Sequence, residues 1–310
     1  MKAIAVVSFG GPEVLQVVDL PEPHPGKGEV RIRVRAAAVN PTDTGLRAGL
    51  YGSFLQSTAP HVPGMDAAGV VDEVGEESDW AIGDEVMAIV LQMGPRGGAY
   101  AEQIVVPADS VARIPSGVDF VAASTLPMNG LTARRTLDQL DLQPKQTIAV
   151  TGAAGAYGGY VVQMAKASGL SVIADASESD ETLVSTLGAD LVVRRGIDVA
   201  QRIRHEIPQG VDGLADGAVL NGAVLPAIRD AGGMAVVRSW SGPSERGITI
   251  HQTWVREYAL NRAALDGLRV QVEQGLITPR VAGTFPAEQA GIAHRELEAG
   301  GRRGRFVLEF

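Results

Sequence analysis

Apolar and polar residues alternate with a period of two along much of the first hundred residues, a pattern typical of strands with one buried face. The clearest stretch is Glu29–Val39, with an apolar side and a basic side: Val30, Ile32 and Val34 against Arg31, Arg33 and Arg35. Shorter runs bounded by glycine or proline are Lys2–Val7, Val14–Leu20, Gly69–Val74, Glu85–Val90 and Tyr100–Val106. Several short strands at this spacing predict a barrel-like β domain.

The pattern changes near residue 120, where apolar residues recur at helical spacing and strands begin to alternate with helices. The predicted helices are Ser124–Leu140, Tyr157–Ser168, Glu178–Leu187, Asp198–Glu206 and Gly222–Asp230. The predicted strands between them are Gln146–Val150, Ser171–Ala174, Ala189–Val193, Gly210–Ala215 and Met234–Val237. This alternation, with short glycine-containing connections, favours a doubly wound parallel sheet, and so an α/β fold with a separate β domain. Beyond it we expect Ile248–Val255, a long helix near Glu257–Gln274 and a closing strand at Arg305–Phe310.

Composition narrows the class of protein. The chain has 310 residues, enough for about two domains. Its 45% hydrophobic and 20% charged residues exclude intrinsic disorder as the main state. A net charge of −9 without a basic stripe argues against nucleic acid and anionic membrane surfaces as partners. The absence of cysteine excludes a disulfide framework, a thiol nucleophile and a cysteine metal site.

The first residues give no sign of a targeting segment. Met1–Val7 holds one lysine and an apolar run that is too short for a secretory signal. No stretch of about 18 apolar residues occurs, so we expect no membrane span. The expected location is the cytoplasm.

The sharpest motif is a glycine-rich turn between an apolar strand and the start of a helix. Its residues are Thr151, Gly152, Ala153, Ala154, Gly155, Ala156, Tyr157, Gly158 and Gly159. A pyrophosphate bound there approaches main-chain N–H groups at the positive end of the helix, where a large side chain would block it. Gly158 would let the helix pack tightly on the strand. An ordinary tight turn is the alternative, but the flanking elements and an acidic residue about 20 positions on favour dinucleotide binding.

That acidic residue is Asp175, which ends the next predicted strand and is followed by Ala176 and Ser177. An aspartate there accepts hydrogen bonds from the ribose hydroxyls, which favours NAD. Arg194 and Arg195 end the third strand and could clamp the 2′-phosphate of NADP at the same corner. The alternative for this pair is a solvated strand end. The residues themselves leave NAD and NADP both open.

A series of short motifs runs through nearly the whole chain in a fixed order. They are Met1–Ala3, Phe9–Pro12, Val39–Asp43, Pro63–Val71, Gly83–Val86, Gly98–Glu102, Asn129–Ala133, the glycine-rich turn, Leu187–Asp190 and Gly304–Leu308. In this order the chain resembles the zinc-free medium-chain dehydrogenases/reductases, in their quinone oxidoreductase (zeta-crystallin-like) branch. The resemblance implies a GroES-like β domain built from residues 1–121 and 256–310 and a Rossmann domain of residues 122–255. It also implies hydride transfer from a nicotinamide, usually NADPH, to quinones or α,β-unsaturated carbonyls, by a homodimer often paired through the Rossmann sheet edge.

The resemblance also bears on zinc. Zinc-dependent relatives place a cysteine at the position of Asn40, a histidine near Met65 and another cysteine near residues 128–129. The five histidines are scattered and form no i, i+4 pair: His24, His61, His205, His251 and His294. We therefore expect no metal site, with the substrate carbonyl polarised by hydrogen bonds instead.

Within this family the nicotinamide lies in a cleft between the domains. The matching motifs make Asn40, Asp43 and Tyr51 the catalytic candidates. Asn40 would orient substrate by its amide, but residues 40–43 can equally be a helix N-terminal cap with Asp43 structural. Asn129 is either a cofactor contact or a buried amide that satisfies the main chain.

Further cofactor candidates follow from the same resemblance. Ser239 and Trp240 come after the last core strand, and Trp240 either flanks the substrate or packs on loop backbone. Arg305 matches a basic position that is either functional or structural. The full set is Asn129, Thr132, Gly152, Ala153, Ala154, Gly155, Ala156, Tyr157, Gly158, Asp175, Ala176, Ser177, Arg194, Arg195, Ser239, Trp240 and Arg305.

Two departures from the family pattern concern tyrosines. Many relatives carry a tyrosine two residues after Asp43, where this chain has Gly45. Tyr51 is a substitute acid only if it is correctly placed, and solvent protonation, which needs no residue, is the default. Tyr157 stands where a smaller aliphatic residue is usual, so it either narrows the cofactor cleft or packs against the first domain.

Three functions remain in competition. The leading one is an NADPH-dependent quinone or enone reductase. A pathway-specific enoyl reductase with a narrow substrate is the second. The third is a non-catalytic NADP(H)-binding protein, which tight cofactor binding without turnover would favour.

Overall fold

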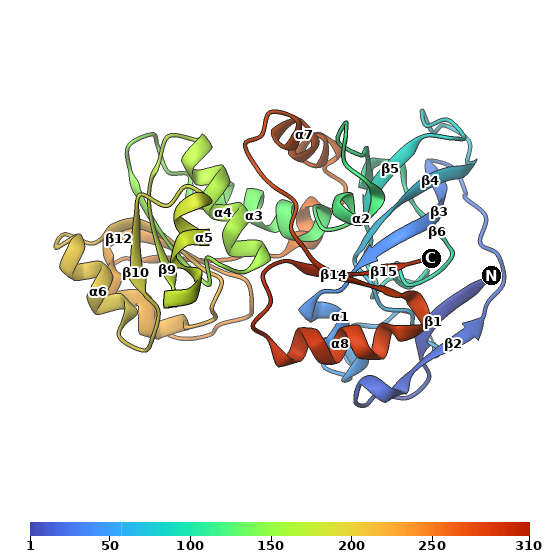
Figure 1. The fold of residues 1–310 in the computed structure, drawn as a ribbon, viewed down its shortest axis with the longest axis horizontal. Coiled ribbons are helices and arrows are strands. Elements are labelled where there is room, and N and C mark those ends of the chain that lie inside the picture. Colours follow the sequence, from blue (N-terminus) through green and yellow to red (C-terminus); the bar gives the residue numbers. More distant parts are fainter. Residues whose placement is uncertain (57) are drawn as a thin grey trace. The chain divides into compact units, whose positions relative to one another are not determined.

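The computed structural model describes residues 1–56 and 58–310, which divide into two compact units. Unit 1 contains Met1–Met128, Ala259–Gln274 and Pro279–Phe310. Unit 2 contains Asn129–Tyr258 and Gly275–Thr278. The first unit is therefore assembled from both ends of the chain, as the blue and red ribbons of Figure 1 show. The domain boundaries expected from the sequence, which end the first β segment at residue 121 and begin the second at residue 256, stay a prediction.

Unit 1 is built on a seven-stranded sheet with the order β14-β15-β3-β4-β5-β7, in which β6 also pairs with β3. The strands of this sheet are β3 (Glu29–Ala38), β4 (Asp66–Val74), β5 (Glu85–Ile89), β6 (Gln103–Pro107), β7 (Val111–Arg113), β14 (Val281–Pro286) and β15 (Arg305–Glu309). A separate antiparallel pair consists of β1 (Lys2–Val6) and β2 (Leu15–Asp19). The helices are α1 (Pro41–Arg47), α2 (Phe120–Ala123), α7 (Arg262–Glu273) and α8 (Ala290–Ala299), with 3-10 turns η1 (Pro12–Val14), η2 (Gly52–Phe54), η3 (Ala108–Ser110) and η7 (Ala287–Gln289).

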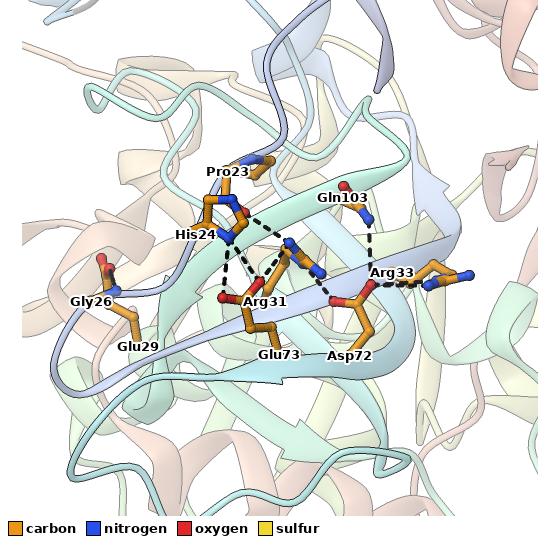
Figure 2. A network of polar contacts seen from close by, with 9 residues as sticks. All are labelled: Pro23, His24, Gly26, Glu29, Arg31, Arg33, Asp72, Glu73 and Gln103. Carbon is orange, nitrogen blue, oxygen red and sulfur yellow. Dashed lines mark hydrogen bonds and ion pairs between the residues drawn. The ribbon is translucent and has the colours of Figure 1, made fainter.

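The alternation predicted for β3 is confirmed. Val30, Ile32 and Val34 are almost fully buried in the core of unit 1. Two arginines of the opposite face pair with Asp72 on the neighbouring strand β4: Figure 2 shows Arg31 (Nε–Oδ1 2.7 Å) and Arg33 (Nη2–Oδ2 3.3 Å). Period-two patterning thus places charge where partners on the next strand can compensate it.

Unit 2 is a six-stranded, all-parallel sheet with the order β10-β9-β8-β11-β12-β13. Its strands are β8 (Thr147–Thr151), β9 (Ser171–Ala176), β10 (Leu191–Arg194), β11 (Val211–Asp216), β12 (Ile228–Val236) and β13 (Thr249–Gln252). Its helices are α3 (Pro127–Leu140, whose first two residues belong to unit 1), α4 (Ala156–Ala167), α5 (Glu181–Thr186) and α6 (Val199–Glu206), with 3-10 turns η4 (Glu178–Asp180), η5 (Asn221–Ala227) and η6 (Val255–Tyr258). In chain order the strands are arranged 3-2-1-4-5-6, so the predicted doubly wound sheet is confirmed. The order reverses between β8 and β11, which puts the glycine-rich turn at the switch point.

Three predicted helices are wrong in extent or kind. The segment predicted as Gly222–Asp230 forms the 3-10 turn η5, which contains Pro226, and then enters β12 at Ile228. The predicted Ser124–Leu140 begins only at Pro127, where α3 starts, and the separate short helix α2 ends before it at Ala123. The predicted Glu257–Gln274 also begins late, at Arg262, because the Asn261 side chain accepts the main-chain N–H of Ala264 and caps α7 there.

No helix in the described part of the chain is long and apolar enough to cross a membrane. A cytoplasmic location remains a prediction.

Candidate active site

The glycine-rich turn joins β8 to α4 at the carboxyl edge of the unit 2 sheet. Gly152 has a φ of +66°, which only glycine adopts without strain. Gly158 is required by packing, since a Cβ there would lie 2.3 Å from the Gly152 carbonyl oxygen. Gly155 differs from both. Its φ of −70° and ψ of 168° suit any residue, and a Cβ there would meet only the Gly152 oxygen, at 3.1 Å.

Glycine at position 155 is therefore required neither by the local backbone conformation nor by dense internal packing. The absence of a side chain at Gly155 leaves open space beside the N-terminus of the twelve-residue helix α4. Main-chain N–H groups and the positive end of the helix dipole favour an anion at such a position. The residues present thus fit the pyrophosphate of a dinucleotide.

Asp175 lies beneath this turn, with 5% of its surface exposed. Its Oδ1 accepts the main-chain N–H of Ala153 (3.2 Å). Burial raises the pKa of this carboxyl, whereas hydrogen bonds from the main chain of Ala153 and Gly152 lower it. The Asp175 carboxylate thus stabilises the glycine-rich turn by accepting a main-chain hydrogen bond.

The corner beyond β9 is formed by the residues that follow Asp175. Ala176 pairs with Arg194 of β10, and its carbonyl accepts the main-chain N–H of Arg195 (2.9 Å). The guanidinium of Arg194 lies 3.7 Å from the exposed carboxylate of Glu178. Ser177 donates its hydroxyl to Asp180. Two arginines and a serine therefore gather at the corner where the adenosine ribose of a dinucleotide lies in doubly wound sheets.

Residues that the sequence reasoning missed hold the neighbouring loop in place. Asp216, at the end of β11, accepts the hydroxyl of Thr151 (2.7 Å) and the main-chain N–H groups of Leu220 (3.1 Å) and Asn221 (2.7 Å). This carboxylate ties the loop after β11 to the glycine-rich turn. The only sequence signal for it is an acidic residue at the carboxyl end of a predicted strand.

Tyr157 packs within unit 2. Its hydroxyl hydrogen-bonds Thr136 on α3 (2.8 Å), and its ring lies against Gly217, where a Cβ would come within 3.0 Å of the ring. Burial raises the pKa of this phenol, which stays protonated.

The remaining unit 2 candidates lie on α3 and after β12. Asn129 and Thr132 are both buried on α3. Trp240 packs against the unit 2 core and over the backbone of Gly242, where a Cβ would overlap the indole. Of the two roles expected for Trp240, the structure thus shows packing on loop backbone. Ser239 precedes it in the same loop.

In unit 1, Asn40 and Asp43 form the N-terminal cap of α1. The Asn40 side chain accepts the Asp43 main-chain N–H, and Asp43 Oδ2 accepts the Asn40 main-chain N–H (2.8 Å). Asn40 Nδ2 also donates to Asp66 Oδ2 (2.7 Å). All three side chains are fully buried, so the predicted helix-cap role of Asn40 and Asp43 is confirmed. A catalytic role of Asn40 or Asp43 stays a prediction.

The cap belongs to a larger buried network. The Tyr100 hydroxyl donates to Asp43 Oδ2 (3.1 Å) and hydrogen-bonds His294 Nε2 (3.2 Å). Burial raises the pKa of Asp43 and of Asp66 to about 7, and the nearby positive charge of Arg305 opposes both shifts. Burial lowers the pKa of His294 to about 3, so this imidazole is neutral. Arg305 belongs to unit 1, where it compensates buried acids.

Tyr51 is the only one of the three catalytic candidates with exposed surface. Its ring lies over Gly45: a Cβ at position 45 would be 2.7 Å from Tyr51 Cε2 and 3.2 Å from its hydroxyl oxygen. Glycine at 45 is thus what allows a phenol from position 51 to occupy this face of α1.

Within residues 1–56 and 58–310, no group of three or more histidine, cysteine, aspartate or glutamate side chains is placed to hold a metal ion. The side chains at or near the positions where zinc-dependent relatives carry ligands are two amides and two thioethers: Asn40, Met65, Met128 and Asn129. This set does not fit zinc. Independence from zinc remains a prediction.

A dinucleotide-type turn at the switch point of one unit, in a chain whose other unit is a β unit made from both chain ends, is typical of a nucleotide-dependent oxidoreductase. A family model described as "Alcohol dehydrogenase GroES-like domain" matches residues 26–116, and one described as "Zinc-binding dehydrogenase" matches residues 187–308. The chain is 30% identical to the quinone oxidoreductase of Mus musculus, over 99% of this chain and 97% of that protein. It belongs to the medium-chain dehydrogenase/reductase superfamily, in the quinone oxidoreductase branch.

Solved structures agree with this assignment. An NAD-dependent alcohol dehydrogenase is 30% identical, with a TM-score of 0.87 over the whole of both chains. A mycobacterial protein solved in complex with NADPH is 28% identical, with a TM-score of 0.87 over the whole of both chains. The chain is therefore an oxidoreductase with a nicotinamide cofactor and a small-molecule substrate, as predicted.

Proposed function

We propose that this protein is an NADPH-dependent, zinc-independent reductase of quinones and α,β-unsaturated carbonyls. The observation that carries the proposal is Gly155, which keeps open a space that neither its φ and ψ nor tight packing requires. A glycine kept for a ligand at a helix N-terminus implies an anionic ligand. The similarity to the mouse quinone oxidoreductase supports the choice of acceptor.

The preference for NADPH rests on the corner beyond β9. One carboxylate oxygen of Asp175 accepts a hydrogen bond from the glycine-rich turn, so this residue is committed in part to holding the turn and less to a ribose. Arg194, Arg195 and Ser177 offer donors suited to a phosphate. Two observations favour NADH instead: Glu178 competes with a phosphate for Arg194, and one similar structure is that of an NAD-dependent alcohol dehydrogenase. The NADPH complex of another supports the phosphate assignment, because all of that chain aligns with this one.

When bound, NADPH supplies the hydride that reduces the electron-poor carbon of the acceptor. Asn40 and Asp43 contribute by holding α1, since both are buried in the cap. Tyr51 contributes by presenting its phenol beside α1, where it donates a hydrogen bond to the acceptor oxygen. Solvent water protonates the resulting enolate or hydroquinone, since the carboxyl groups of Asp43 and Asp66 are fully buried in the cap of α1.

The test is oxidation of NADPH and of NADH, followed by absorbance, against matched panels of quinones and conjugated enones. We expect rapid NADPH oxidation with one acceptor class and slow NADH oxidation. The Gly155→Val variant serves as the control, because it should remain folded and lose turnover. Faster reaction with NADH would refute the cofactor assignment. Cofactor binding without oxidation by any acceptor would favour a narrow enoyl reductase or a non-catalytic protein.

We also propose a homodimer that pairs through β13. This strand ends the unit 2 sheet and has a sheet neighbour, β12, on one side, whereas the opposite edge strand, β10, carries the proposed phosphate corner. Antiparallel pairing of two β13 strands would join the sheets of two copies. Sedimentation at micromolar concentration should give twice the mass of the chain, and Ile250→Pro should reduce it to the monomer mass. A monomer at all concentrations would refute the proposal.

A further inference from the structure

Asp66 is a buried carboxylate to which the proposed reaction assigns no role. It is the first residue of β4 and is fully buried. Its two oxygens accept from different parts of unit 1: Oδ2 from Asn40 Nδ2 (2.7 Å) and Oδ1 from the main-chain N–H of Met128 (2.6 Å). A buried charge is costly unless its hydrogen bonds are made, so this geometry calls for an explanation.

The first bond fixes the orientation of the Asn40 amide. Asp66 Oδ2 accepts from Asn40 Nδ2, so the NH₂ group of Asn40 is turned toward Asp66. The amide oxygen then lies on the other side, where it accepts the Asp43 N–H and caps α1. The reversed amide would place oxygen against carboxylate on one side and NH₂ against N–H on the other. Asp66 thus enforces the cap of a helix that it does not touch directly.

The second bond reaches the start of α3. Pro127 has no N–H, so the Met128 N–H is the first main-chain donor of this helix, and no residue preceding it in the helix can accept it. Asp66 accepts this donor and brings negative charge to the positive end of the helix. The next residue of α3 is the cofactor candidate Asn129.

We propose that Asp66 is a positioning residue, which sets the direction of the Asn40 amide and so holds α1 together with the loop that carries Tyr51, while its second oxygen holds the start of α3. The inference rests on the proposed function, since Tyr51 is the proposed substrate contact. Asp66 itself acts only through Asn40 and Met128.

The chain offers an exact exchange of hydrogen-bonding groups as a test. In Asp66→Asn, the NH₂ of the new amide faces the NH₂ of Asn40, so the amide of Asn40 reverses and the cap is lost. In the double variant Asn40→Asp with Asp66→Asn, the carboxylate and the amide change places. The aspartate at 40 accepts from the main chain of residue 43 and from the new amide, whose oxygen accepts from Met128. Every bond described above can then re-form.

We expect Asp66→Asn to lower kcat/KM for the acceptor by about 10- to 100-fold, the loss of one charge-assisted hydrogen bond. The double variant should recover to within about fivefold of the original protein, and melting temperature should follow the same order. A fully active Asp66→Asn would overturn the proposal. So would a double variant that folds with the original melting temperature but stays inactive, because the charge at 66 itself would then be needed. If the single variant does not fold, the double variant decides: recovery supports the inference, and failure to fold overturns it.

The single variant Asn40→Asp supplies a readout that a merely structural role would not move. It sets two buried carboxylates against each other, with Asp43 on α1 and Arg305 on β15 as the charged groups facing them. Such a pair shares one proton. Its activity should therefore rise as the pH is lowered, and a pH profile identical to that of the original protein would count against the geometry. If the original protein oxidises neither cofactor with any acceptor, the proposed function fails, and the order of melting temperatures still tests Asp66.

Discussion

Replacing Gly155 by alanine isolates the role of the open space at the glycine-rich turn. The new Cβ would meet the Gly152 oxygen at 3.1 Å, a contact that a shift of a few tenths of an ångström relieves, and its φ and ψ suit alanine. At the N-terminal cap of α4, alanine is the poorer residue by up to about 1 kcal/mol. We therefore expect the free energy of unfolding to change by no more than about 1 kcal/mol.

Binding should respond far more strongly than stability. A methyl group in the space for the pyrophosphate displaces it from main-chain donors, and each charge-assisted hydrogen bond lost costs about 1.5–3 kcal/mol. Loss of one such bond weakens the dissociation constant for NADPH by about 10- to 100-fold. The assay is a fluorescence titration of NADPH, with thermal unfolding measured on the same samples.

Gly158→Ala is the matched control. Its Cβ would lie 2.3 Å from the Gly152 oxygen and 2.8 Å from the Ala153 Cα, both main-chain atoms that cannot rotate away. We expect this variant to lose about 1–3 kcal/mol of stability through overpacking. An unchanged NADPH affinity in a well-folded Gly155→Ala protein would refute the assignment of this turn to the cofactor.

Three further outcomes are expected. Replacing Arg194 and Arg195 together by alanine should weaken NADPH binding at least tenfold more than NADH binding, and equal losses in calorimetric titrations would remove both from the phosphate site. Tyr51→Phe should lower kcat about tenfold with little change in melting temperature, whereas unaltered steady-state kinetics would exclude the phenol from the reaction. Because burial raises the pKa of Asp43 and Asp66 to about 7 in the folded state, from 3.8, the folded state binds more protons between these values. The free energy of unfolding should thus fall as the pH rises from 5 to 7, by up to about 1.4 kcal/mol per pH unit for each group, and urea titrations that show a rise would contradict the burial argument.

The sequence predicts those features that depend on local pattern. Alternation in β3 and the strand–turn–helix at Gly152–Gly158 are visible because each residue's role depends on near neighbours. The predicted helix at Gly222–Asp230 failed for a tertiary reason: Ile228 begins β12, and its partner in the sheet is Val211 on β11. Propensity alone cannot show such a pairing.

The candidate site divides in the same way. The cap formed by Asn40 and Asp43 was foreseen as an alternative, because both residues lie within one turn. Asp66 was not foreseen, since its two partners lie 26 and 62 residues away along the chain. Asp175 was predicted as a ribose contact from its position at the end of a strand. Its hydrogen bond from the Ala153 N–H, which directs the carboxylate toward the glycine-rich turn, could not be predicted in this way.

The composition of unit 1 from both chain ends bears on how the protein is made. In the seven-stranded sheet, β15 lies between β14 and β3, so one edge of β3 has no strand partner until residues 305–309 have been synthesised. Phe306 and Leu308 on this strand belong to the core of the unit. The doubly wound sheet, in contrast, is complete once the ribosome has added Gln252. During vectorial synthesis the nucleotide-binding unit can therefore fold first, while the edge of β3 that pairs with β15 stays exposed and needs protection from aggregation until the last strand emerges.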